Sequence, residues 1–426
     1  MKKLAFSLLL VYLVILPLID QLNYKIYGKI GYDNLFMSII FFLCIISVLL
    51  SSKHKIGPLT SNIFFIGFVF LYLIGSFLPT FSSFLFGKQP NPHQLTMGLR
   101  FIQMVVILLV LDFLIKDWLS FKKVLIAYIM GAIIAAFFGF GQALNIGLFW
   151  DIADKYYLIG RPHLSVYIRR IKMVSFWPES GNTFGSYMVM SLLLILGMGS
   201  LFLKKTFRWA MVFLTGVIIS LSYTSIIAMI IGFCSLIFVS AKKKMIIKKS
   251  YIKGAFFVSV LVILLALVFS ERMATRVRSY LRFGGENTLL ISGLNGRLEM
   301  WSEFWGFIRE RSSMAFLLGK GYAFSGIADN YYIELLAAGG LISLSFFVLI
   351  LGSLFIFSFE RSLFYKNKIP RLYYINRTIL IMITALAVML LTGSYFSYLP
   401  TVFPLLILVV GAKNFKYFRE RQYVKA

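Results

Sequence analysis

Long runs of apolar residues with almost no charge recur along the whole chain. Examples are LAFSLLLVYLVILPL at 4–18, VSVLVILLALVFS at 258–270 and LISLSFFVLILGSLFIFS at 341–358. Segments of about 17 to 25 such residues cross a bilayer as helices, because a helix satisfies its own backbone hydrogen bonds. Hydrophobic residues make up 60% of the sequence, which is more than a soluble core absorbs. The runs therefore predict an all-α polytopic membrane protein.

The apolar runs predict about twelve transmembrane helices. The expected spans are 4–20, 34–50, 60–79, 95–115, 123–144, 183–203, 208–222, 225–240, 253–270, 334–358, 374–392 and 398–412. No small-residue cleavage site follows the first run, so we expect a retained helix rather than a signal peptide. We expect a single integral membrane domain over residues 1–426.

The segments between the helices alternate in charge. One set includes both termini and the lysine-rich run at 241–253, and the positive-inside rule places this set in the cytoplasm. The net charge of +27 is then mostly a signal of topology, and nucleic-acid binding explains it poorly. Two long connections, 145–182 and 271–333, are predicted to be extracytoplasmic loops, and long ordered loops often carry function.

Arginine is the more frequent basic residue in the predicted outer segments, whereas lysine dominates the inner ones. Lysine is sufficient for orientation and for anionic lipid headgroups. Arginine offers a planar fork that binds phosphate oxygens through two parallel bonds. The outer arginines indicate either a phosphate-bearing ligand or salt bridges with the outer acids, and charge alone does not choose between these.

The loop at 145–182 combines a cationic cluster with a carboxylate. Its stretch LSVYIRRIKMVSFW is β-branched and aromatic, which favours a short strand or hairpin. Glu179 follows in FWPESGNTFG, where the chain re-enters the membrane. Glu179 is a first-turn helix acid, an ion-pair partner of an arginine, or a carboxylate held beside a cationic patch. The arginines of this cluster are Arg161, Arg169 and Arg170.

The loop at 271–333 is rich in arginine, tryptophan and glycine. Trp301 and Trp305 fall on one apolar stripe, which suits either an interfacial helix or packing on neighbouring helices. Arg297 begins this helix, where a cation is unfavourable for the helix dipole, so we expect another partner for it. Asp329–Asn330 precedes the next apolar run. We expect this pair to cap the helix and also to face any substrate site that the outer loop forms.

A pattern of residues in the second loop carries a resemblance to a known group of enzymes. The chain resembles the superfamily of O-antigen polymerases and O-antigen ligases, whose pattern reads R…W…G.G…(D or H)N.Y…L…GGL. The matching residues are Arg297, Trp301, Gly319, Gly321, Asp329, Asn330, Tyr332, Leu336, Gly339 and Gly340. The earlier stretch RR…F.PESGNTFG resembles the other outer-loop motif of the family.

Two departures from the family pattern bear on the subgroup. Asp329 stands where the ligases typically place a histidine, and this favours a Wzy-type polymerase. Ile226 stands where the family often has an arginine in its T-x-S-R helix, so any role for that arginine is in doubt here. An O-antigen ligase is the alternative enzyme. A flippase or other transporter of lipid-linked oligosaccharides is a more distant alternative, since the chain shows no repeated halves.

The resemblance implies a GT-C-like membrane glycosyltransferase of the plasma (inner) membrane, with its active site on the extracytoplasmic face. Its substrate would be an undecaprenyl-diphosphate-linked oligosaccharide, and the product would be O-antigen, capsule or exopolysaccharide. A chain-length regulator, a flippase and membrane lipids are the implied partners. No cofactor is expected, because outer arginines can stabilise the leaving diphosphate without a metal.

The same resemblance assigns roles to individual residues. Glu179 and Asp329 are the candidate catalytic carboxylates, one of which would orient the acceptor hydroxyl or take its proton. Arg100 is costly in lipid, so it either faces a polar cavity or extends to the interface. The candidate diphosphate-binding residues are Arg100, Arg161, Arg169, Arg170 and Arg297, and those that position substrate are Asn182, Asn330 and Tyr332.

Overall fold

The computed structural model describes residues 1–19, 32–49, 92–144, 146–156, 181–203, 206–220, 222–240, 301–302, 313–319, 330–366, 368–392 and 399–424. All regular secondary structure within these residues is helical. The helices are α1 (Lys2–Ile19), α2 (Tyr32–Leu49), α5 (Pro92–Leu114), α6 (Trp118–Ala143), α7 (Gly147–Tyr156), α9 (Gly181–Met198), α10 (Thr206–Ile219), α11 (Tyr223–Ser240), α15 (Ser313–Leu318), α16 (Tyr331–Tyr365), α17 (Pro370–Met389) and α18 (Leu399–Val424). Two short 3-10 turns, η1 (Gly199–Leu201) and η3 (Leu390–Thr392), follow α9 and α17.

The prediction of an all-helical membrane protein is confirmed at this level. Each predicted span that falls on the described residues overlaps a helix, while 60–79 and 253–270 lie outside them. Within the described part, 5 helices are long and apolar enough to cross a membrane. These five are Lys2–Ile19, Trp118–Ala143, Asn182–Leu201, Tyr331–Tyr365 and Pro370–Met389.

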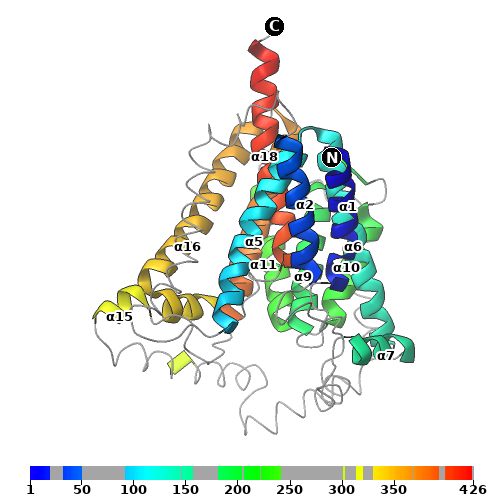
Figure 1. Ribbon diagram of the computed structural model, residues 1–426, viewed down its shortest axis with the longest axis vertical. Coiled ribbons are helices and arrows are strands. Elements are labelled where there is room, and N and C mark those ends of the chain that lie inside the picture. The colour runs from blue at the N-terminus through cyan, green and yellow to red at the C-terminus, as the bar shows by residue number, and fades with distance from the viewer. Residues whose placement is uncertain are drawn as a thin grey trace.

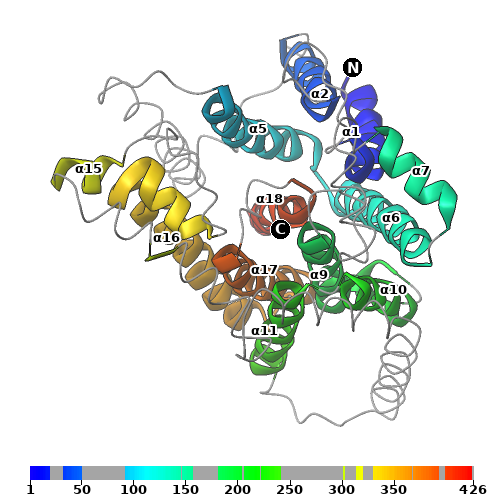
Figure 2. The same cartoon turned by 90° about the horizontal axis from the view of Figure 1, so that it is seen from below.

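The helices form a bundle around α18. Helix α18 packs against α5, α6, α9 and α17, and Figure 2 shows it near the middle of the ring that the other helices make. The two chain termini lie at one end of the bundle, and α7 and α15 lie at the opposite end (Figure 1). The beginning of α16 therefore lies at the same end as α7 and α15, which belong to the two long loops.

Large apolar side chains also lie on the outside of the bundle. Phe137 is 63% exposed, Phe238 is 76% exposed and Ile356 is 58% exposed. A soluble monomer rarely exposes many such side chains, whereas acyl chains solvate them without cost. The outward-facing apolar surface therefore agrees with the length and hydropathy of the helices.

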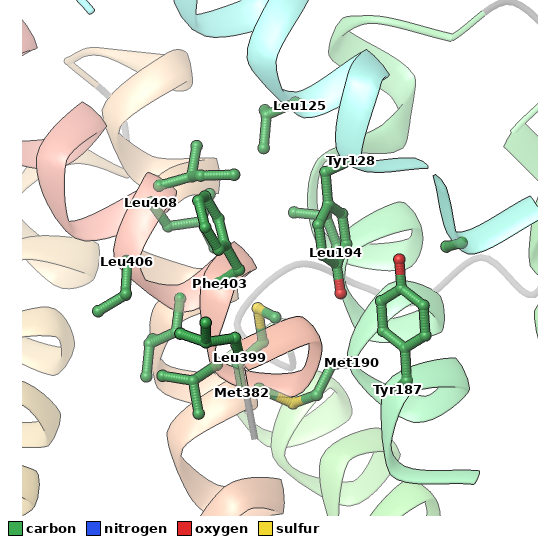
Figure 3. Packing of buried hydrophobic residues seen from close by; sticks show 14 of the residues in the cluster. Leu125, Tyr128, Tyr187, Met190, Leu194, Met382, Leu399, Phe403, Leu406 and Leu408 are labelled. Carbon is green, nitrogen blue, oxygen red and sulfur yellow. The ribbon is translucent and has the colours of Figure 1, made fainter. Parts of the chain in front are cut away.

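A pair of buried tyrosines holds α6, α9 and α18 together. Tyr128 and Tyr187 lie edge to face, with ring centroids 5.6 Å apart (Figure 3). The Tyr128 hydroxyl donates to the carbonyl oxygen of Pro400 at 3.0 Å. Pro404 stands four residues later in α18 and has no N–H, so this carbonyl lacks its normal helical donor. Tyr128 thus satisfies a backbone group that would otherwise be costly in an apolar core.

Helix α16 is broken at Gly340, inside the predicted span 334–358, and the sequence pattern did not indicate this break. Gly340 has φ 67° and ψ −170°, outside the helical region. The ring centroids of Tyr331 and Phe347 lie 5.2 Å apart. In a straight helix these positions would be separated by about 24 Å along the axis. The first turns of α16 therefore fold back onto the segment after Gly340, and the longer apolar part runs from 341 to 365.

Candidate functional site

The structure describes some of the predicted site residues and not others. Asn182, Asn330 and Tyr332 are described with their side chains, and Arg100 falls in α5 by its backbone alone. The other predicted residues lie outside the described part of the chain, as does the expected hairpin at 164–177. They are Glu179, Asp329, Arg161, Arg169, Arg170 and Arg297.

Asn330 is the N-cap of α16. Its Oδ1 accepts hydrogen bonds from the backbone N–H of Tyr332 at 3.0 Å and of Ile333 at 3.3 Å. Its backbone is extended and its side chain is buried. A carboxamide in this position satisfies two of the N–H groups that have no partner within the helix. The expected cap thus falls on Asn330, and Asp329 precedes the N-cap position.

The capping bonds of Asn330 should contribute to the stability of the folded protein. Asn330→Ala removes both bonds and should lower the free energy of unfolding by about 1 kcal/mol. Asn330→Asp keeps an oxygen acceptor of similar size and should unfold close to the wild-type temperature. Thermal unfolding of the purified protein in detergent measures both. If the aspartate variant is as unstable as the alanine variant, the carboxamide nitrogen rather than Oδ1 matters, and the capping role is wrong.

Tyr332 and Trp301 fix the beginning of α16 against its surroundings. The Tyr332 hydroxyl donates to the carbonyl oxygen of Ala387 in α17 at 3.0 Å. Trp301 packs against Ile333 and Ala337 on the first turns of α16. Of the two interpretations of the tryptophan stripe, Trp301 therefore follows the one in which it packs on a neighbouring helix.

Two glycines allow α15 to dock onto the break in α16. Gly319, directly after α15, has φ 72°, and Gly340 has φ 67°. A Cβ built on Gly340 would lie 2.1 Å from the carbonyl oxygen of Leu317, and one on Gly319 would lie 2.4 Å from the Gly340 nitrogen. Both positions need a left-handed backbone and a backbone-to-backbone approach, so only glycine fits. We call Trp301, Gly319, Asn330, Tyr332 and Gly340 the α16 group.

A second set of polar residues gathers at the beginnings of α9, α11 and α18. The Ser225 hydroxyl donates to the carbonyl oxygen of Asn182 at 3.5 Å, and the hydroxyls of Ser186 and Thr401 lie 3.2 Å apart. A Cβ built on Gly185 would lie 2.5 Å from the hydroxyl oxygens of both Ser220 and Ser225. We call Asn182, Gly185, Ser186, Ser225 and Thr401 the α9 group; it joins two family-like stretches, SGNTFG and SYTS.

Ser225 and Thr401 were not among the predicted site residues. The SYTS stretch that ends at Ser225, which resembles part of the family pattern, was the available signal in the sequence. Thr401 has no motif, and only the packing of α18 on α9 brings it to Ser186. No pattern in the sequence predicts the contact between Ser186 and Thr401.

The geometry gives the end of the bundle near α15 a defined electrostatic character. Contacts within the α9 group place the first turns of α9, α11 and α18 side by side, and α16 begins at the same end (Figure 1). Each helix N-terminus carries a partial positive charge, although side chains already accept from several of the N–H groups at the starts of α11 and α16. Several such termini together favour a negatively charged group, and the predicted arginine-rich loops connect to this end.

The described residues contain no group of three or more His, Cys, Asp or Glu side chains able to hold a metal ion. Metal-independent chemistry stays a prediction. The fold and the hydropathy together define the chain as a helical membrane protein. No protein-family model matches the chain, and no curated protein matches it either.

Proposed function

We propose that the chain is a membrane glycosyltransferase that polymerises surface polysaccharide. It would join oligosaccharide repeat units carried on undecaprenyl diphosphate, at the extracytoplasmic face of the plasma membrane. The observation that carries the proposal is the α16 group. Residues that match the family pattern are separated along the sequence, yet Trp301, Gly319, Asn330, Tyr332 and Gly340 all contribute to one structural unit around the first turns of α16.

The proposed reaction needs three contributions from the protein. A glycosidic bond forms between the acceptor hydroxyl and the anomeric carbon as the bond to the lipid diphosphate breaks. The acceptor proton leaves, and Glu179 or Asp329 would orient or accept it. The departing diphosphate gains charge, which the arginines of the two long loops and the clustered helix N-termini would stabilise. The membrane anchors both lipid substrates and so limits their relative orientations.

The ligase alternative differs only in its acceptor. A ligase would transfer the glycan once to a different acceptor, whereas a polymerase uses another lipid-linked repeat unit. Asp329 in place of the ligases' histidine is the feature that favours polymerisation. A flippase would move the lipid-linked unit across the membrane and form no new glycosidic bond.

The test is reconstitution. Purified protein in lipid nanodiscs, given undecaprenyl-diphosphate-linked repeat units from its own host, should produce a ladder of glycans on a gel. One undecaprenyl diphosphate should be released for each linkage formed, without added metal and in the presence of a chelator. Single transfer to another acceptor lipid would establish the ligase instead. Intact repeat units after prolonged incubation, in a preparation shown to be folded, would contradict both enzymes.

A further inference from the structure

A cluster of basic side chains lies at the end of the bundle opposite the α16 group. Lys2 begins α1, Lys116 lies between α5 and α6, and Lys413 lies in the part of α18 nearest the C-terminus. The Nζ atoms of Lys2 and Lys116 lie 5.0 Å and 6.0 Å from the centroid of the same ring, that of Phe113. We call Lys2, Lys116 and Lys413 the basic cluster.

The acidic residues near the basic cluster neutralise only part of its charge. Asp112 is fully buried, and its Oδ1 accepts from Lys413 Nζ at 2.9 Å. Lys116 Nζ donates to the backbone carbonyl of Asp112 at 2.7 Å rather than to its carboxylate. The Asp117 carboxylate caps α6 by accepting from the Ser120 N–H at 2.7 Å. Within the described residues, Lys2 and Lys116 therefore have no carboxylate at ion-pair distance.

The surroundings of Lys116 make its positive charge unfavourable in the absence of a further anion. Burial lowers the pKa of the Lys116 ammonium; Asp112 raises it, and the charges of Lys2 and Lys413 lower it further. Helix α1 also begins at this end, so the positive end of its dipole adds to the same region, whereas the Asp117 carboxylate offsets the dipole of α6. A bound anion would relieve this mutual repulsion.

The surface beside the basic cluster is apolar. Met1 is 50% exposed, Leu4 is 51% exposed and Leu119 is 60% exposed, and α1 packs along α6. Trp118 lies at the beginning of α6, with the guanidinium of Arg371 4.7 Å from its ring. Tryptophan and arginine are typical of the boundary between headgroups and acyl chains. A ligand at this place would meet cations and exposed apolar side chains together.

From this juxtaposition we infer that the basic cluster is a binding site for the headgroup of an anionic phospholipid. The phosphate lies between Lys2 and Lys116, and the acyl chains run along Leu4 and Leu119 on the outside of α1 and α6. Free phosphate fits the charges but leaves the apolar part of the surface without a partner. The site is independent of the proposed glycosyl transfer, since it lies at the other end of the molecule.

The experiment uses the full-length protein purified in a neutral detergent. Phosphatidylglycerol is titrated against phosphatidylcholine, and bound lipid is counted by native mass spectrometry while thermal unfolding is followed in parallel. The wild type should retain phosphatidylglycerol and unfold at a higher temperature with it than with phosphatidylcholine. Lys2→Gln/Lys116→Gln should weaken retention roughly 20- to 30-fold, since each lysine near an anionic headgroup contributes about a fivefold effect.

Lys123→Gln is the matched control, because Lys123 is an exposed lysine in the first turns of the same helix α6. It should bind phosphatidylglycerol like the wild type. If the double variant folds poorly, Lys2→Gln alone should still weaken retention about fivefold, and Lys116→Arg should preserve it. Unchanged retention in Lys2→Gln, equal loss in Lys123→Gln, or equal stabilisation by millimolar inorganic phosphate would each overturn the inference.

Discussion

Gly340→Ala is expected to destabilise the protein by at least about 3 kcal/mol and to deplete it from the membrane. The φ of 67° with ψ −170° belongs to a region that is almost exclusive to glycine. The added Cβ would also lie 2.1 Å from the Leu317 carbonyl oxygen, which is backbone and cannot rotate away. The substitution should therefore separate α15 from α16 as well as strain the break.

Helix α16 provides its own control for this prediction. Gly352 lies in the straight part of the same helix, and a Cβ there would meet nothing within 4 Å. Gly352→Ala should leave stability unchanged or raise it by up to about 1 kcal/mol, because alanine is the better helix former. Thermal unfolding in detergent and membrane abundance measure both variants. A wild-type unfolding temperature for Gly340→Ala would mean that the break is not required for the fold.

The positions of the helices could be predicted because membrane spans are encoded locally. A run of apolar residues bounded by charge marks a helix whatever its neighbours are, so the expected spans that fall on the described residues overlap observed helices. The last predicted span ends at 412, where hydropathy falls, whereas α18 continues to Val424. A fall in hydropathy marks the residue where a helix leaves the apolar phase. The helix itself can continue beyond that residue.

The break in α16 and the helix α7 were missed for a different reason. GGL within an apolar run looks like two tolerated glycines, and only the docking of α15 requires a left-handed backbone at Gly340. Helix α7 lies in the loop at 145–182, and Trp150 secures it by donating to the Gln142 carbonyl at the end of α6 at 3.2 Å. Both features depend on tertiary contacts, which the sequence pattern does not contain.

The predicted site residues also show features that are encoded locally and features that depend on tertiary contacts. The sequence correctly indicated a cap before α16, because the preference of Asn and Asp for this position is a local property. It did not indicate that Tyr332 would contact Ala387 or that Ser225 would contact Asn182. In both described contacts, a motif side chain supports the backbone of a neighbouring helix. Contacts of this kind fix the beginnings of α9 and α16, next to which the two long loops connect.

The capping geometry sharpens the test of the two candidate carboxylates. Both cap bonds are accepted by Asn330, so Asp329→Asn removes a charge without removing either of them. Any loss of activity with normal stability would then report on the charge of Asp329. Glu179→Gln applies the same isosteric change to the other candidate.

Asp329→Asn and Glu179→Gln are each expected to shorten the product from long polymer to single repeat units. Loss of a general base typically lowers the rate by about 100- to 10,000-fold, and loss of the charge that orients an acceptor also prevents elongation. We expect the larger effect from Glu179→Gln, because Glu179 lies nearer in sequence to the arginines at 161–170. Product length on a gel is compared with the membrane level and unfolding temperature of each variant. Wild-type ladders from both variants would remove carboxylate catalysis from the proposed mechanism, whereas a wild-type ladder from Asp329→Asn alone would leave Glu179 as the base.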